Sequence, residues 1–188
     1  MAKTKEQLLN ILDQFQLDEK VVSAEPFGNG HINDTLKVTN EKGEIKYVLQ
    51  RINHLIFTNV DMLQNNIHVV TTHIRKKLEE KGETDIDRKV LTFLPTKDGK
   101  KYYFDGDSYW RVCLFIPRSK SYEEVTPELS YEAGKAFGDF QTMLSDIPEG
   151  TLGETIPDFH NMEFRWGQFH EAVAANPAGR VEEVKGLG

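Results

Sequence analysis

The chain has 188 residues, of which 38% are hydrophobic and 28% charged, and its formal net charge is −7. This composition excludes wholesale disorder, and the acidic balance excludes a broad nucleic-acid-binding surface, which needs a basic excess. A single cysteine, Cys113, excludes an internal disulfide. No run approaches the ~18 consecutive apolar residues that a membrane span requires. We therefore expect a cytoplasmic protein with neither nucleic acid nor a membrane as its partner.

The first part of the chain alternates helical and extended patterns that are separated by turns. Thr4 and Gln7 have the spacing of a capping box, and apolar residues follow at helical intervals, which predicts a helix over residues 4–16. Runs rich in β-forming residues then predict three strands and a tight turn. The strands are expected over residues 21–27, 31–39 and 45–52, with the hairpin turn over residues 40–43.

A long amphipathic helix is the clearest periodic element of the chain. Six apolar residues recur at intervals of three or four and so lie on one stripe: Val60, Leu63, Ile67, Val70, Ile74 and Leu78. Gly82 is placed to end this helix. Further strands are expected over residues 89–94, 101–104 and 109–116, and further helices over residues 127–145 and 161–175.

A glycine-rich loop lies between the first two expected strands. Gly28 and Gly30 flank Asn29 in the stretch F-G-N-G-H-I-N. Loops of this kind, between antiparallel strands, cover phosphate groups with backbone N–H donors. Roughly one G-x-G is expected by chance in a chain of this length, so the two glycines could equally be ordinary turn residues. Their meaning depends on the rest of the chain.

The order of the elements resembles the small lobe of the protein-kinase-like fold: three strands, a long helix, further strands and then helices. Five runs make the resemblance more specific. They are F-G-N-G-H-I-N (27–33), Y-V-L-Q-R-I-N (47–53), Y-W-R-V-C-L-F-I (109–116), E-A-G-K-A-F-G-D-F-Q (132–141) and F-H-N (159–161). Together they resemble the aminoglycoside phosphotransferase superfamily, and within it the N-acetylhexosamine 1-kinases, over about residues 10 to 180.

The resemblance implies an α+β fold in two parts. Residues 1–116 would form a nucleotide-binding small lobe, with an antiparallel sheet of about five strands and a long helix. Residues 117–188 would form the hinge and the first helices of a mostly helical large lobe. The implied activity is ATP- and Mg²⁺-dependent phosphorylation of the anomeric hydroxyl of N-acetylglucosamine or N-acetylgalactosamine.

The resemblance also assigns nucleotide-binding residues. Gly28, Asn29 and Gly30 would cover the phosphates, and Phe115 and Ile116 would form the hinge beside the adenine.

Gln50 stands where kinases carry a phosphate-binding lysine. Because glutamine has no charge, either Arg51 supplies the missing charge or it comes from elsewhere in the chain. Trp110 and Arg111 are interpreted as structural, and Cys113 as a small buried hydrophobe.

Two polar residues beside the glycine loop are candidates for substrate binding. His31 and Asn33 are expected on one face of the second strand, where they either reach the substrate or form an exposed polar face. Asp34, on the other face, is interpreted as structural. The two interpretations of His31 and Asn33 are left open.

No catalytic residue or metal ligand is assigned within these 188 residues. The kinase-like catalytic loop needs His-x-Asp followed by an Asn, and none of the six histidines has that context. In the family these elements come later in the polypeptide, so the missing C-terminal half is the expected partner and this chain alone should be inactive. Phe137, Phe140 and Leu144 would then be uncovered, which predicts self-association.

Three rival functions compete with the kinase that the resemblance implies, and the sequence rejects one of them. Another small-molecule kinase of the same fold would act on choline, homoserine or an aminoglycoside. A non-catalytic nucleotide-binding module is the rival from a different class. A sulfatase is rejected, because Cys113 lacks the [CS]-x-P-x-R context from which formylglycine is made.

Overall fold

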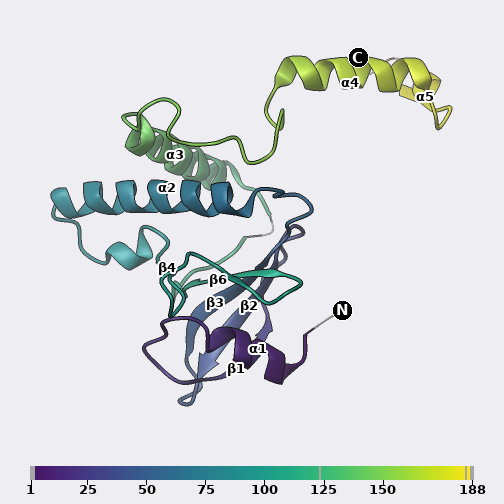
Figure 1. Ribbon diagram of the computed structural model, residues 1–188. Coiled ribbons are helices and arrows are strands. Elements are labelled where there is room, and N and C mark those ends of the chain that lie inside the picture. Colours follow the sequence, from purple (N-terminus) through teal and green to yellow (C-terminus); the bar gives the residue numbers. More distant parts are fainter. Residues whose placement is uncertain (1–2, 123, 185, 187–188) are drawn as a thin grey trace. The chain divides into compact units, whose positions relative to one another are not determined.

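The computed structural model describes residues 3–122, 124–184 and 186 (Figure 1). It divides into two compact units, residues 1–155 and residues 156–188. The first unit is of the α+β class and contains one six-stranded antiparallel sheet. The second unit is helical and consists of α4 (Met162–Ala175) and α5 (Val181–Val184). The α+β class predicted from the sequence is therefore confirmed, and each of the six predicted strand ranges overlaps one strand of the sheet.

The sheet has the strand order β1-β2-β3-β6-β4, and β5 also pairs with β6. All pairs are antiparallel, and the hairpins β1–β2 and β2–β3 join neighbours in sequence. The turn between β2 and β3 uses Gly43 at φ +80°, a conformation that favours glycine. The strands are β1 (Val21–Pro26), β2 (Asp34–Asn40), β3 (Ile45–Ile52), β4 (Phe93–Leu94), β5 (Tyr103–Phe104) and β6 (Tyr109–Leu114).

Helix α1 (Lys5–Leu12) packs on one face of this sheet, which we call the α1 face. Thr4 caps the helix in the predicted capping box. Side chains of alternate residues along the strands meet it in the main hydrophobic core, which includes Leu12, Leu49 and Val112. Each of these three side chains is fully buried. Burial of such residues is the main stabilising contribution to this unit.

Helix α2 (Val60–Glu80) lies across the opposite face of the sheet, which we call the α2 face (Figure 1). Val60 and Leu63 pack there against Ile52 of β3. The predicted stripe faces inward along the helix, and Gly82 follows its end at φ +69°. Both the position and the length of this long helix confirm the prediction.

Helix α3 (Pro127–Leu144) belongs to the first unit and docks against α2. Lys77 Nζ donates to the carbonyl oxygen of Met143 (2.7 Å), and His73 Nε2 lies 2.8 Å from Asp146 Oδ1. Beyond α3, Asn66 of α2 exchanges two hydrogen bonds with the backbone of Gly153, at 2.6 and 3.0 Å. These bonds fix α3 and the segment after it to α2.

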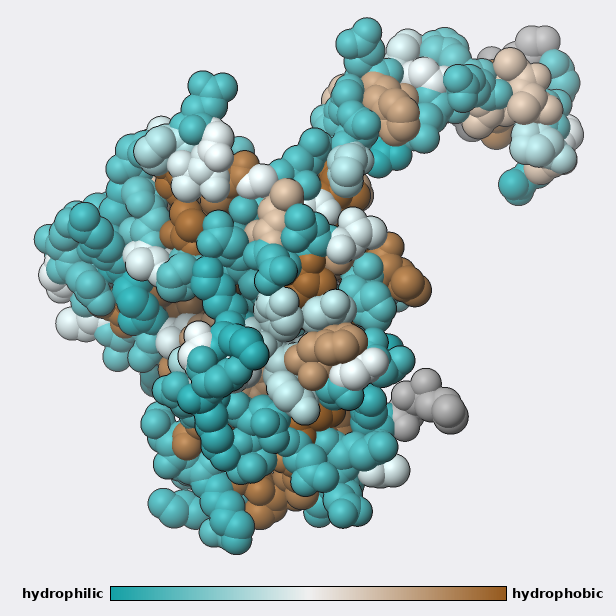
Figure 2. All heavy atoms as spheres, in the orientation of Figure 1, coloured by the Kyte–Doolittle hydropathy of each residue, from teal (hydrophilic) through white to brown (hydrophobic). Residues whose placement is uncertain are grey.

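The apolar surface of α3 is only partly as expected. Phe137 is 71% exposed and Phe140 is also exposed, as predicted. The expectation for Leu144 is wrong, because this side chain packs against a cluster that contains Ile74 and Leu78 of α2. Figure 2 shows a surface that is mostly hydrophilic in this view, with scattered apolar residues. Self-association of the chain stays a prediction.

Several predicted element ends need correction. The first helix ends at Leu12 instead of residue 16, because Phe15 turns away to form a bridge with Thr96. The predicted strand over residues 89–94 is reduced to β4, and a short 3-10 helix, η1 (Ile86–Arg88), precedes it. The strand over residues 101–104 is reduced to β5. Both are short because each pairs with only one part of β6.

In the part of the chain that the structure describes, no helix combines the length and the apolar character needed to cross a bilayer.

Candidate functional site

The glycine loop connects β1 to β2, as predicted, and occupies residues 27–33. Its entry is fixed by the backbone, since the N–H of Phe27 donates to the carbonyl oxygen of Thr35 at 2.9 Å. Gly28 adopts φ +80°, which allows the chain to turn there. Gly28, Asn29 and Gly30 are exposed, and a Cβ added at either glycine would meet no atom within 4 Å. The loop therefore leaves space for a ligand close to its backbone.

Behind the loop, three polar side chains form a row across neighbouring strands of the α2 face. Thr35 of β2 pairs in register with Gln50 of β3, and Gln50 pairs with Arg111 of β6. Arg111 Nε donates to Gln50 Oε1, and Gln50 Nε2 donates to Thr35 Oγ1, each at 3.0 Å. Because Phe27 pairs with Thr35, the row leads directly from the glycine loop to a guanidinium group.

Arg111 is a partly buried cation without a compensating carboxylate among the described residues. Its guanidinium lies 5.2 Å from the centroid of the Phe93 ring, and its Nη1 has no hydrogen-bond partner. It forms no ion pair with any acidic residue that the structure describes. Burial lowers the pKa of Arg111, yet a guanidinium stays protonated in proteins. Burial also raises the pKa of the neighbouring Cys113 thiol to about 11, so the thiol is neutral at pH 7 and provides no anion.

The segment predicted as a hinge lies on the same side of the sheet as this row. Phe115 follows the end of β6, and its N–H still donates to the carbonyl oxygen of Lys46. Its ring contacts the ring of Phe27 edge to face, with centroids 5.9 Å apart. Ile116 follows directly and is partly buried. The structure therefore joins the glycine loop to the predicted hinge through two aromatic rings.

Arg51, the other predicted phosphate ligand, points to the opposite face of the sheet. It pairs with Asp34, whose carboxylate accepts from Arg51 Nε at 2.6 Å. Side chains of successive strand residues alternate between faces, so Gln50 and Arg51 cannot reach the same point. A hollow of about 720 Å³ borders the glycine loop on this α1 face, with Arg51, Lys3 and Lys5 in its lining. Arg51 and Arg111 therefore lie on opposite faces of the sheet.

The expected positions of His31 and Asn33 need correction. The second strand begins at Asp34, so neither residue lies on a strand face. The side chain of Asn33 instead accepts a hydrogen bond from the backbone N–H of Asn53 at 3.0 Å. This bond holds the end of the glycine loop against the residue after β3. His31 is exposed within the loop.

Trp110 and Arg111, both interpreted as structural, have different surroundings. Trp110 is buried in the α1-face core and donates from Nε1 to Asp105 Oδ2 at 2.9 Å. Arg111 instead lies in the row beside Gln50. Sequence reasoning did not single it out for binding, since its only signal was an arginine inside a run of strand-forming residues. Its importance depends on a partner that lies 61 positions earlier in the chain.

Within the described ranges, no group of three or more His, Cys, Asp or Glu residues is placed to hold a metal ion. No protein-family model matches the chain. The site thus combines a glycine loop, a partly buried guanidinium and an aromatic pair.

Proposed function

We propose that this chain is the nucleotide-binding part of an ATP-dependent kinase that phosphorylates the anomeric hydroxyl of an N-acetylhexosamine. In this proposal residues 1–116 are a protein-kinase-like small lobe, and residues 117–188 are the hinge and the start of a helical large lobe. One observation carries the nucleotide-binding part of it. The partly buried guanidinium of Arg111, whose Nη1 is buried without a partner, lies in the same row of residues that begins at the glycine loop.

A polyphosphate fits this row chemically. A buried cation is stabilised by an anion nearby, and Arg111 has a free Nη1 to donate to one. The backbone N–H groups of Gly28 to Gly30 would add further donors from the loop. The adenine would lie near Phe115 and Ile116, with the ring of Phe27 as an apolar wall. Gln50 would hold the guanidinium in position, because its amide bridges Arg111 and Thr35.

Mg²⁺, when bound with the nucleotide, would supply positive charge that offsets the charge of the phosphates. In this proposal the chain contributes the binding and orientation of the nucleotide. The proposed metal ligands and the aspartate that orients the acceptor hydroxyl would come from polypeptide outside these 188 residues. The sugar would meet the nucleotide at that part of the enzyme.

The sugar specificity rests on the sequence resemblance, whereas nucleotide binding rests on the geometry. A kinase that acts on choline, homoserine or an aminoglycoside would use the same row and loop. A nucleotide-binding module without catalysis would use them too. These alternatives differ in the acceptor that they phosphorylate, and an acceptor panel separates them.

The direct test is a titration of the purified chain with ATP and Mg²⁺, followed by calorimetry. We expect saturable binding of one nucleotide, with no ADP released when N-acetylglucosamine is added. A longer polypeptide that includes a His-x-Asp catalytic loop should phosphorylate N-acetylglucosamine or N-acetylgalactosamine in preference to choline, homoserine and kanamycin. Absence of saturable nucleotide binding would refute the proposal, and a preference for another acceptor would refute its sugar assignment.

A further inference from the structure

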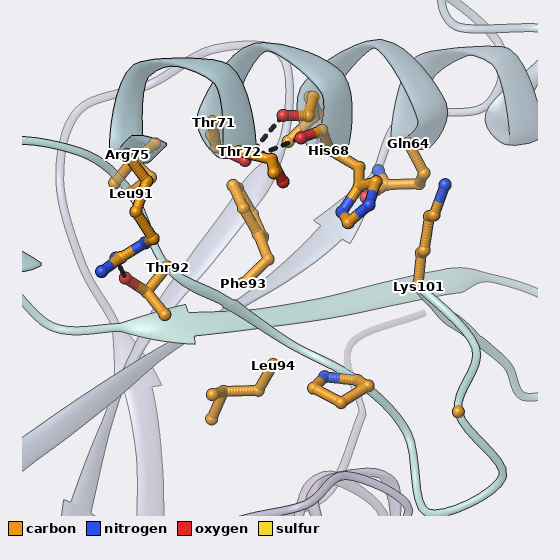
Figure 3. A pocket seen from close by; sticks show the side chains of 13 residues that line it. Gln64, His68, Thr71, Thr72, Arg75, Leu91, Thr92, Phe93, Leu94 and Lys101 are labelled. Atoms are coloured by element: carbon orange, nitrogen blue, oxygen red, sulfur yellow. Dashed lines mark hydrogen bonds between the residues drawn. The ribbon is translucent and has the colours of Figure 1, made fainter. Parts of the chain in front are cut away.

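A second hollow, which we call the α2–β4 pocket, lies between α2 and the segment that contains β4 (Figure 3). Its volume is about 460 Å³. Gln64 and His68 line it from the helix, Phe93 and Leu94 from the strand, and Lys101 from the turn that precedes β5. None of these residues belongs to the glycine loop or to the row that ends at Arg111. The pocket is thus distinct from the glycine loop, although its Phe93 ring also contacts the guanidinium of Arg111.

The side chain of Gln64 is the clearest sign of a ligand. Gln64 is only 3% exposed, and its Nε2 has no hydrogen-bond partner. A buried amide donor that lacks an acceptor lowers stability, and native proteins rarely leave one unsatisfied. Figure 3 shows Gln64 beside His68 and Lys101 at one end of the pocket. An acceptor atom placed at this end would satisfy the amide.

The charge of the lining favours an anionic acceptor. None of the acidic residues that the structure describes lines the pocket, whereas Arg75 and Lys101 both do. Arg75 is already engaged, since its Nη2 donates to Asp87 Oδ1 at 2.7 Å and also to Thr92. The Lys101 ammonium makes a long bond of 3.1 Å to Asn65 Oδ1 and lies on an exposed residue, so it can turn toward a ligand.

The rest of the pocket is apolar. Leu94 points away from the helix to the core of the α1 face. Phe93 lies between β4 and the helix in Figure 3, and Ile67, Leu91 and Pro95 extend the apolar lining. A ligand that fits must therefore place an apolar body on these residues and a small acceptor group at Gln64 and Lys101. A phosphate dianion matches less well than a carboxylate, because one neutral donor and one ammonium would compensate only part of its charge.

We propose that the α2–β4 pocket binds a small amphipathic carboxylic acid, with its carboxylate on Gln64 Nε2 and Lys101 Nζ and its apolar body on Phe93 and Ile67. Burial of the apolar body provides the main driving force, and the two donors select a carboxylate over a neutral group. Because the ligand contacts both α2 and β4, its binding would also stabilise their packing by mass action.

The probe for the test is 2-naphthoate, titrated into the full chain and followed by ligand-observed NMR and by thermal unfolding. The uncharged 2-naphthamide is the matched ligand control, and inorganic phosphate tests for a simple anion site. Lys101→Gln and Gln64→Leu remove the two donors one at a time. Lys97→Gln removes a nearby exposed ammonium that does not line the pocket, and it serves as the matched protein control.

We expect saturable 1:1 binding of 2-naphthoate by the wild-type chain. Lys101→Gln and Gln64→Leu should each weaken it by about tenfold, and 2-naphthamide should bind about tenfold more weakly than the acid. Lys97→Gln should bind as the wild type does. Gln64→Leu should still fold, since it replaces an unpaired amide by an apolar group.

Three results would overturn the proposal: no saturable binding of 2-naphthoate, equal binding of the acid and the amide, or unchanged affinity in both donor variants. Displacement of 2-naphthoate by inorganic phosphate alone would also count against it, because it would indicate a site for simple anions. Nucleotide binding is measured separately and does not enter any of these results.

Discussion

Replacing Arg111 by methionine is the sharpest test of the proposed nucleotide site, and Arg51→Met is its matched control. Both substitutions remove one positive charge and keep a flexible apolar stem. The two residues lie on the neighbouring strands β6 and β3 but face opposite sides of the sheet. Arg111 points to the α2 face beside Gln50, whereas Arg51 points to the α1 face and pairs with Asp34.

The expected effect on stability is small for both variants. Arg111→Met loses a hydrogen bond to Gln50 worth about 1 kcal/mol and a cation–π contact with Phe93 worth about 0.5–1 kcal/mol. It also removes the unpaired Nη1, whose burial costs about 1–3 kcal/mol, so the net change should lie within about 1 kcal/mol. Arg51→Met breaks an exposed ion pair worth about 0–1 kcal/mol.

The expected effect on nucleotide binding is very different. A charge-assisted hydrogen bond to a phosphate contributes about 1.5–3 kcal/mol, so Arg111→Met should weaken binding of ATP with Mg²⁺ by about 10–100-fold. Arg51→Met should change it by less than about twofold, because Asp34 already neutralises that charge. Calorimetric titration measures the affinities, and urea unfolding measures the stabilities. The reasoning is refuted if Arg51→Met loses as much affinity as Arg111→Met, which would place the phosphates on the α1 face.

Two further predictions concern carboxylates whose pKa the fold lowers. Burial alone would raise the pKa of Asp105, but hydrogen bonds from Lys3, Ser108, Trp110 and Asp107 outweigh it and lower the pKa to about 2. The resulting stability of about 2 kcal/mol should be complete above pH ~4 and lost as the pH falls toward 2, and Asp105→Asn should abolish this part of the acid dependence of urea unfolding. Lys77 and His73 lower the pKa of Asp146 to about 2 as well, so Asp146→Asn should speed hydrogen exchange in α3 at pH 7 while exchange in β3 stays unchanged.

The parts of the fold that were predicted correctly are those that local patterns determine. The limits of β3 follow from a run of β-forming residues between a turn and a loop. The limits of α2 follow from a stripe that repeats over its whole length. The start of β2 was wrong because it depends on a distant contact, the bond between the side chain of Asn33 and the backbone of Asn53. No local pattern contains that information.

The candidate site also could not be predicted from local patterns, because successive side chains of a strand face opposite sides of the sheet. The sequence places Gln50 and Arg51 next to each other, and either could have supplied the donor that faces a phosphate. Once β3 is paired with β2 and β6, a step of one residue moves a side chain to the other face of the sheet. Gln50 then shares its face with Thr35 and Arg111, and Arg51 is left with Asp34. In the proposed nucleotide site, Arg111 would therefore supply across the sheet the charge that Gln50 lacks, and only the register between strands places Arg111 beside Gln50.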